Sequence, residues 1–175
     1  AMTTFADAWV KNGVADAGFV DYINDPQKVT FPWSMIDKIT PRSSAKVQDY
    51  LKGLGFEDTE LIHTNKGTYA AFVNAENAQY LVIEDTFPNG RPALENAGVI
   101  FTDRATVDKV ERMKVCTCLN PLHTALAVYG CLLGYTLIAD EMKDAQLKGL
   151  IEKIGYQEGL PVVTNPGVLE PQAFI

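Results

Sequence analysis

The pattern of apolar residues changes at about Ala105, and this change constrains the fold more than any other feature of the sequence. Before it, short β-branched and aromatic runs at 68–73, 79–84 and 99–102 alternate with segments rich in Gly and Pro, as strands and loops do. After it, apolar residues recur at helical spacing, beginning with Val107, Val110 and Met113. A mixed first half followed by a helical second half predicts the α+β class.

The same patterns predict individual elements. Helices are expected at 5–10, 16–23, 45–54 and 145–154, with extended chain at 29–41 and loops at 87–92 and 160–175, where prolines accumulate. The runs at 68–73 and 79–84 are separated by the polar segment 74–77, which predicts a hairpin. Asn120 followed by Pro121 predicts a helix start, since Asn favours the N-cap and Pro the first turn. We expect that helix to run to about Met142.

Charge and cysteine content exclude several classes of protein. A net charge of -7 argues against nucleic-acid binding, which requires basic surfaces. The three cysteines are an odd number and do not form a disulfide framework, which favours a reducing, cytoplasmic setting. The most apolar stretch, Ala125–Ala139, is shorter than the roughly 20 residues of a membrane span and is predicted to be a core helix, not a membrane segment.

Neither end resembles a domain boundary, so we expect an internal fragment of a longer protein.

Lys114, Asn120 and His123 are the residues best suited to chemistry. The expected helix start places His123 in the first turn, where the positive end of the helix favours a neutral ring that can donate a hydrogen bond. A lysine removed from water can act as a general base, because desolvation disfavours its charged form. From the residues alone, a solvated lysine, a capping asparagine and a structural histidine are the more common interpretation, and catalysis is the alternative. A capping Asn120 would also not be free to hold a substrate.

Three ordered segments resemble the long-chain polyol dehydrogenases, the family of mannitol dehydrogenases and of fructuronate and tagaturonate reductases. The segment 31–41 matches F-P-x-x-M-[IV]-D-[RK]-I-T-P, and 83–92 matches I-E-D-x-F-x-x-G-R-P. The third resembles E-x-x-K…L-N-x-x-H-x-A-L-A and is carried by Glu111, Lys114, Leu119, Asn120, His123, Ala125, Leu126 and Ala127. Together the three segments extend over about half of the chain.

The resemblance implies a role for each matched residue. Lys114 would be the general base, and Asn120 and His123 would polarise the substrate oxygen. Glu111 would control proton exchange with solvent, and Asp37 would contact a substrate hydroxyl. Hydride transfer would belong to NAD, bound mostly outside this chain in a Rossmann domain of the same protein. No Gly-x-Gly-x-x-Gly strand-turn-helix unit is present in the sequence.

The spacing from Lys114 to Asn120 is one residue longer than the family's usual spacing. On a regular α-helix the extra residue rotates Lys114 by about 100° away from the Asn/His face. A π-bulge, which inserts one residue into a helix and favours functional sites, could restore the alignment.

These observations together predict the organisation and function of the parent protein. Residues 1–104 would complete the cofactor-domain side, and 105–175 would begin a helical C-terminal catalytic domain. The parent would be an NAD-dependent oxidoreductase that interconverts a hydroxyl of a polyol or hexonate with the corresponding ketone. Its substrate would be a sugar alcohol or keto-hexuronate, and the isolated fragment would be inactive. The alternative is a non-catalytic interaction or structural module.

A zinc site built on Cys116, Cys118 and His123 lacks a fourth ligand, so no metal is expected and buried thiols are favoured.

Overall fold

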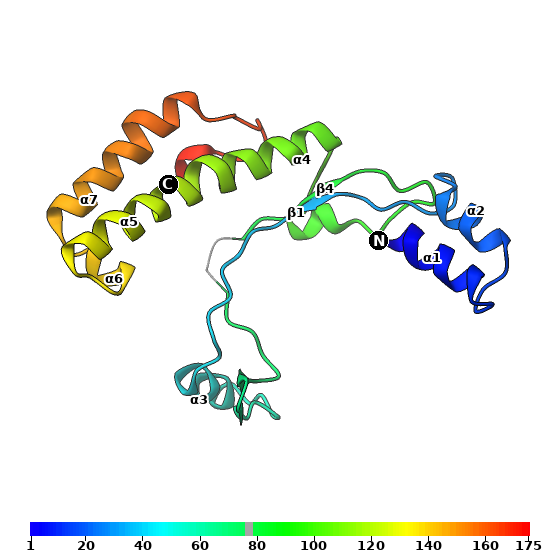
Figure 1. Cartoon of the computed structure of the whole chain (residues 1–175), viewed down its shortest axis with the longest axis horizontal. Helices are drawn as coiled ribbons and strands as arrows, with labels where there is room; N and C mark the ends of the chain where they lie inside the picture. Colours follow the sequence, from blue (N-terminus) through cyan, green and yellow to red (C-terminus); the bar gives the residue numbers. More distant parts are fainter. Residues whose placement is uncertain (76–78) are drawn as a thin grey trace. The chain divides into compact units, whose positions relative to one another are not determined.

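The structure, a computed structural model, describes residues 1–75 and 79–175. It divides into two compact units, one formed by 1–36 with 80–175 and the other by 37–79. The first unit contains α1 (Met2–Lys11), α2 (Gly18–Asn24), β1 (Ser34–Met35), β4 (Val82–Glu84), η1 (Leu94–Ala97), β5 (Ile100–Thr102), α4 (Arg104–Glu111), η2 (Arg112–Leu119), α5 (Asn120–Leu133), α6 (Ile138–Glu141), α7 (Ala145–Glu152), η3 (Lys153–Gly159), η4 (Leu160–Val162) and η5 (Pro171–Phe174) (Figure 1). The second contains α3 (Ala45–Gly53), β2 (Ile62–Thr64) and β3 (Gly67–Tyr69).

The predicted α+β class is confirmed, because short strands precede Arg104 and helices follow it. The helices expected at 5–10, 16–23, 45–54 and 145–154 are all present, and the loop at 87–92 and the strand near 99–102 agree with the prediction. The tail expected as a loop contains the two short 3-10 turns η4 and η5.

The strand pairing differs from the prediction. The expected hairpin between 68–73 and 79–84 does not form, and residues 76 and 77 of its predicted turn, 74–77, lie outside the described residues. Instead β3 pairs with β2 in the second unit, across a two-residue loop that ends at Gly67 with φ of 150°. In the first unit β4 lies between β1, which is antiparallel, and β5, which is parallel. These non-local partners are selected because they bury Val82, a contact that local sequence does not encode.

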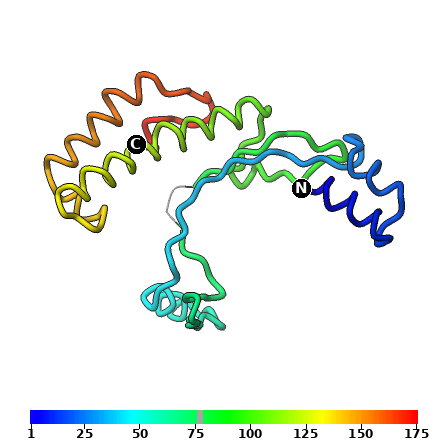
Figure 2. Tube along the Cα trace, in the orientation of Figure 1, coloured from blue at the N-terminus to red at the C-terminus, as the bar shows by residue number. Residues whose placement is uncertain are grey.

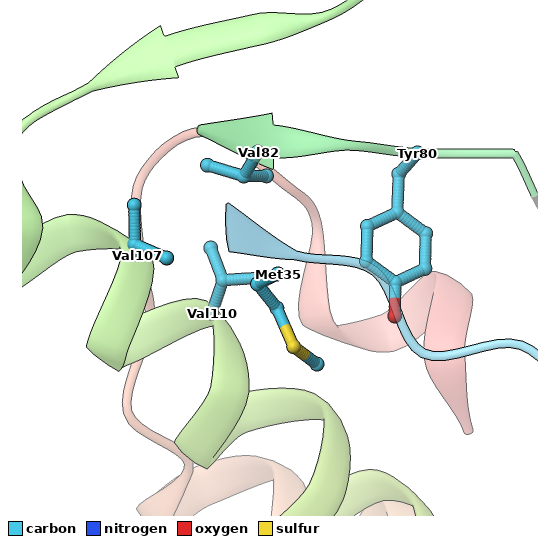
Figure 3. Close-up of a cluster of buried hydrophobic side chains, with 5 residues drawn as sticks. All are labelled: Met35, Tyr80, Val82, Val107 and Val110. Atoms are coloured by element: carbon cyan, nitrogen blue, oxygen red, sulfur yellow. The ribbon is translucent and has the colours of Figure 1, made fainter. Parts of the chain in front are cut away.

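A hydrophobic cluster joins this small sheet to the helix that follows it. Val107 and Val110 project from α4 towards Met35 and Val82 on the strands, and Tyr80 closes the side of the cluster (Figure 3). The predicted apolar face is confirmed, since Val107, Val110 and Met113 are each 0% exposed. The cluster fixes the start of the helix that carries the candidate site residues.

That helix is continuous from Arg104 to Leu133, so the predicted helix start at Asn120 is wrong. Asn120 has helical backbone angles, φ -61° and ψ -42°, and the preceding segment η2 is already a π-helix. Pro121, the second residue of α5, has no N–H to donate back to η2, so the helix lacks one backbone hydrogen bond at this point. The Asn-Pro pair therefore marks the junction between a π-helical and an α-helical segment, and Asn120 does not serve as a cap.

Buried side chains along this helix recur at every fourth position, which is longer than the α-helical period. Such a stripe would drift by about 40° per step on a regular α-helix, at 3.6 residues per turn. The wider i→i+5 turns of η2 offset that drift and keep the stripe facing its partners. The buried residues of the stripe are Val110, Lys114, Cys118, Leu122, Leu126 and Gly130.

The helix ends at Gly134 and does not continue to Met142 as predicted. Gly134 has φ of 86°, in the left-handed region that glycine adopts without steric cost, and Tyr135 donates its N–H to the Gly130 carbonyl at 2.9 Å. The short α6 then folds back, because Gly130 has no side chain and the Glu141 carboxylate packs against it. Further along, η3 is a second π-helical segment that continues α7.

Within the described residues, the helix Arg104–Leu133 is long and apolar enough to cross a membrane by length and composition. It is longer than the stretch Ala125–Ala139 considered in the sequence, because the helix extends through η2 into α4. The core helix of a globular domain, which is mostly buried, passes the same test. Here 22% of the most apolar stretch is buried, and Leu122 and Leu126 pack in a second cluster with Ile151.

Candidate active site

Lys114 lies near the start of the π-helical segment η2 and is only 5% exposed. It follows Met113, which is fully buried, and belongs to the buried stripe of the helix. Its Nζ atom lies 5.7 Å from the centroid of the Phe174 ring, within the range of a cation–π contact. The amine is therefore removed from water and has an aromatic face beside it.

Asn120 and His123 are both exposed and lie three residues apart at the start of α5, on one face of the helix. Because Asn120 is not a cap, its amide is available to a ligand. The Nδ1 atom of His123 lies 3.1 Å from the Leu119 carbonyl oxygen. A carbonyl oxygen only accepts, so Nδ1 carries the proton, and Nε2 of a neutral ring is an acceptor.

The predicted site residues differ in exposure. Asn120 and His123 share an exposed face, whereas Lys114 lies on the buried side of the same helix, beside Phe174. Glu111 is exposed at the end of α4, three residues before Lys114. Asp37 is half-buried and is the first residue of the other compact unit. A π-helical segment is present where the longer spacing predicted one, but it leaves Lys114 in the buried stripe and not on the exposed face of Asn120 and His123.

The two cysteines of η2 differ in environment. Cys116 is exposed, whereas Cys118 is buried with its Sγ atom 3.7 Å from the Pro171 carbonyl and 3.8 Å from Met113 Sδ. Burial raises the pKa of the Cys118 thiol, an effect that the nearby Lys114 partly offsets. A buried thiol of this kind is unreactive. Among the residues described, no three His, Cys, Asp or Glu side chains gather as metal ligands.

The motif at 83–92 forms a structural ion-pair cluster. Arg91 donates from Nε and Nη2 to both Asp85 oxygens, at 2.9 and 3.1 Å, and from Nη1 to Glu95 at 2.6 Å. Its guanidinium also lies 3.3 Å from the centroid of the Phe101 ring. The hydrogen bond from Arg91 holds the pKa of Asp85 below its usual range. Asp85 is thus engaged by Arg91, and the motif has a structural role in this unit.

The connection from β5 to α4 is not suited to binding a dinucleotide. In nucleotide-binding folds, a pyrophosphate occupies such a helix N-terminus above a glycine-rich turn. Here the Asp103 carboxylate accepts hydrogen bonds from Thr106 N at 2.9 Å and Thr106 Oγ1 at 3.1 Å. A carboxylate already at this position would repel a phosphate, so this step does not hold the pyrophosphate of NAD.

Sequence reasoning missed Phe174 and Tyr80. In the sequence Phe174 and Ile175 are only an apolar pair at the end of a tail expected as a loop, but in the structure both pack into the two hydrophobic clusters. Figure 2 shows the C-terminal segment returning beside the helix of α4 and η2. The only sequence signal for this packing is the apolar character of the pair, and it does not reveal the partner.

Comparison with known proteins identifies the family. A family model described as the mannitol dehydrogenase C-terminal domain matches residues 106–174. The D-mannonate oxidoreductase of Thermotoga maritima is 57% identical over the whole of this chain. The chain belongs to the mannitol dehydrogenase family.

Solved structures of this family share the fold. A substrate-free D-sorbitol dehydrogenase matches 94% of the chain with a TM-score of 0.67 and 26% identity. The Pseudomonas fluorescens mannitol 2-dehydrogenase, in a ternary complex with NAD and D-mannitol, matches 93% with a TM-score of 0.60 and 29% identity. The chain covers 31% and 30% of these two structures, and 32% of the Thermotoga maritima relative, so it spans about a third of their length.

Proposed function

We propose that this chain supplies the proton-transfer residues of an NAD-dependent dehydrogenase that interconverts a hydroxyl of a polyol or hexonate with the corresponding ketone. The observation that carries the proposal is the π-helical segment between Lys114 and Asn120, which accommodates one extra residue relative to the family spacing. A hexonate is the favoured substrate, because the relative with 57% identity is a D-mannonate oxidoreductase. Residues 105–175 would begin the catalytic domain, and 1–104 would complete the cofactor-domain side.

Each residue has a part in this chemistry. In oxidation the Lys114 amine accepts the hydroxyl proton as the ketone forms, and in reduction it returns that proton. The Asn120 amide donates a hydrogen bond to the substrate oxygen. His123 donates a second hydrogen bond to that oxygen from Nε2, which requires both ring nitrogens to be protonated, because Nδ1 already donates to the Leu119 carbonyl. Glu111 exchanges the proton with solvent, and Asp37 holds a substrate hydroxyl.

The test is kinetic and uses the complete protein, assayed with D-mannonate and with D-mannitol. Lys114→Ala and His123→Ala are each expected to lower kcat by roughly 10²-fold or more, the usual loss for a general acid-base group. Lys109→Ala is the matched control, because Lys109 is exposed on α4 of the same helix and should leave the rate unchanged. Wild-type rates in both site variants would contradict the mechanism. The 175-residue chain alone should not oxidise NADH with fructuronate.

A non-catalytic association module is the second candidate, favoured by one observation. Val128, Leu132 and Leu133 on α5, with Leu137 just after it, are each at least 52% exposed. Apolar side chains grouped in this way can mediate association. Wild-type kinetics for the Lys114 and His123 variants, together with a smaller sedimentation coefficient for Leu132→Glu, would show that this region mediates association and does not supply the proton-transfer residues.

A further inference from the structure

The Lys114 amine has an aromatic neighbour that no catalytic scheme above uses. Phe174 lies in η5, sixty residues further along the chain, and its ring centroid is 5.7 Å from Lys114 Nζ. An aromatic face carries negative charge density and attracts an ammonium group, most strongly where water is excluded. Lys114 is 5% exposed, so the contact lies in such an environment.

The Phe174 ring is itself held in place from several sides. Tyr80 packs edge-on against it, with ring centroids 5.2 Å apart and an interplanar angle of 86°. Val168 and Leu169 of the same C-terminal segment pack on the cluster that contains Tyr80. Pro171, at the start of η5, is buried and its carbonyl accepts from the Cys118 thiol of η2 at 3.7 Å.

Ile175, the residue after Phe174, packs into the second hydrophobic cluster and holds the C-terminal segment there. Ile175 packs with Leu122, Leu126 and Ile151 in the second cluster. Its Cγ2 atom occupies the space beside Gly155, where an added Cβ would lie only 2.5 Å away. The segment from Val168 to Ile175 therefore crosses both clusters, and Phe174 is the part of it that meets Lys114.

We propose that Phe174 is a positioning residue for Lys114, holding the amine against its ring so that one orientation is available for proton transfer. This inference rests on the proposed dehydrogenase function. A lysine has a flexible four-carbon stem and no preferred direction of its own, so a fixed aromatic face restricts where its amine can lie.

The kinetic test compares variants that keep or remove the ring in the complete protein. Phe174→Leu keeps an apolar side chain but removes the π-face, and should lower kcat about tenfold with little change in KM. Phe174→Tyr keeps the ring and should restore kcat. Val168→Ala is the control, because it loosens the same cluster and leaves the Phe174 ring in place, and it should leave kcat unchanged.

The outcomes separate the two proposals. A complete protein without activity on D-mannonate or D-mannitol overturns the proposed function. Wild-type kcat in Phe174→Leu, or an equal loss in Phe174→Leu and Phe174→Tyr, overturns the positioning role alone.

A spectroscopic readout on the 175-residue chain needs no activity. In a chain labelled with ¹³C-lysine, the ε-methylene signal of Lys114, assigned with Lys114→Arg, should be shifted upfield by the Phe174 ring current. The shift should vanish in Phe174→Leu and persist in Phe174→Tyr. An unshifted signal in the wild-type chain overturns the contact.

Discussion

Deleting one residue from η2 should be tolerated, whereas the same deletion in α5 should not. Cys116 lies in the π-helical segment and Thr124 in the α-helix, and both are exposed. Removing Cys116 shortens the step from Lys114 to Cys118 from four residues to three, so the buried stripe regains an α-helical period without η2. Residues on both sides of the deletion then still face their clusters.

Removing Thr124 has no such compensation. The helix beyond it rotates by about 100°, which turns Leu126 away from Ile151. Leu126 is 4% exposed, and the loss of a buried leucine from a packed site costs about 2–5 kcal/mol. Since a domain of this kind is stable by roughly 5–15 kcal/mol, such a loss is a large part of the total. Deleting Cys116 should cost less than about 1 kcal/mol.

Urea denaturation of the 175-residue chain, followed by circular dichroism, measures the difference. With a slope of about 2 kcal/mol per M, deletion of Thr124 should lower the midpoint by about 1 M or more. Deletion of Cys116 should lower it by less than half of that amount. Equal losses from the two deletions would refute the idea that η2 accommodates one extra residue.

Two further predictions concern the helix ends near α6. Gly134→Ala should destabilise the chain by about 1–2 kcal/mol because φ at Gly134 is 86°, although nothing crowds the site. Gly149→Ala, inside α7, is the control and should be neutral or stabilising. Equal effects of the two substitutions in thermal unfolding would contradict the backbone argument. The pKa of Asp144 is lowered by the hydrogen bonds that its carboxylate accepts, first from the Leu147 N–H, then from the Tyr135 hydroxyl and the Gln146 N–H. The stability that the Asp144 carboxylate contributes should therefore be lost as pH falls below the usual aspartate range. The hydrogen bond to Asp144 raises the pKa of Tyr135. The stability that the Tyr135 hydroxyl contributes should therefore be lost as pH rises above the usual tyrosine range. Asp144→Ser, which keeps a capping oxygen that does not titrate, should flatten the acid limb of the unfolding profile.

The sequence alone predicted the helical second half and indicated the residues that we propose for the site. Val107, Val110 and Met113 could be assigned to one buried face because helical periodicity depends on residues only three or four positions apart. The extra residue between Lys114 and Asn120 likewise indicated a π-helical irregularity, because a fixed rotation per residue makes a one-residue change in spacing detectable.

Strand pairing, by contrast, was decided by the tertiary structure. Val82 pairs with Met35 and with Ile100, partners far away in the sequence that local propensity does not distinguish from a neighbouring run. The local signals at 68–73 and 79–84 favoured a hairpin between them. Burial of β4 between two other strands was worth more than that local pairing.

The environment of Lys114 was also set by distant residues. An Asn-Pro pair locally indicates a helix start, but the chain before Asn120 is held in helical form by packing of Val110 and Cys118 in the interior. The exposure of a lysine likewise depends on what folds over it, here Phe174 from the far end of the chain. The sequence by itself thus determined which residue types stand at which spacing along the helix. The tertiary structure decided that Lys114 is buried while Asn120 and His123 are exposed, because burial arises from contacts between segments that are remote in sequence.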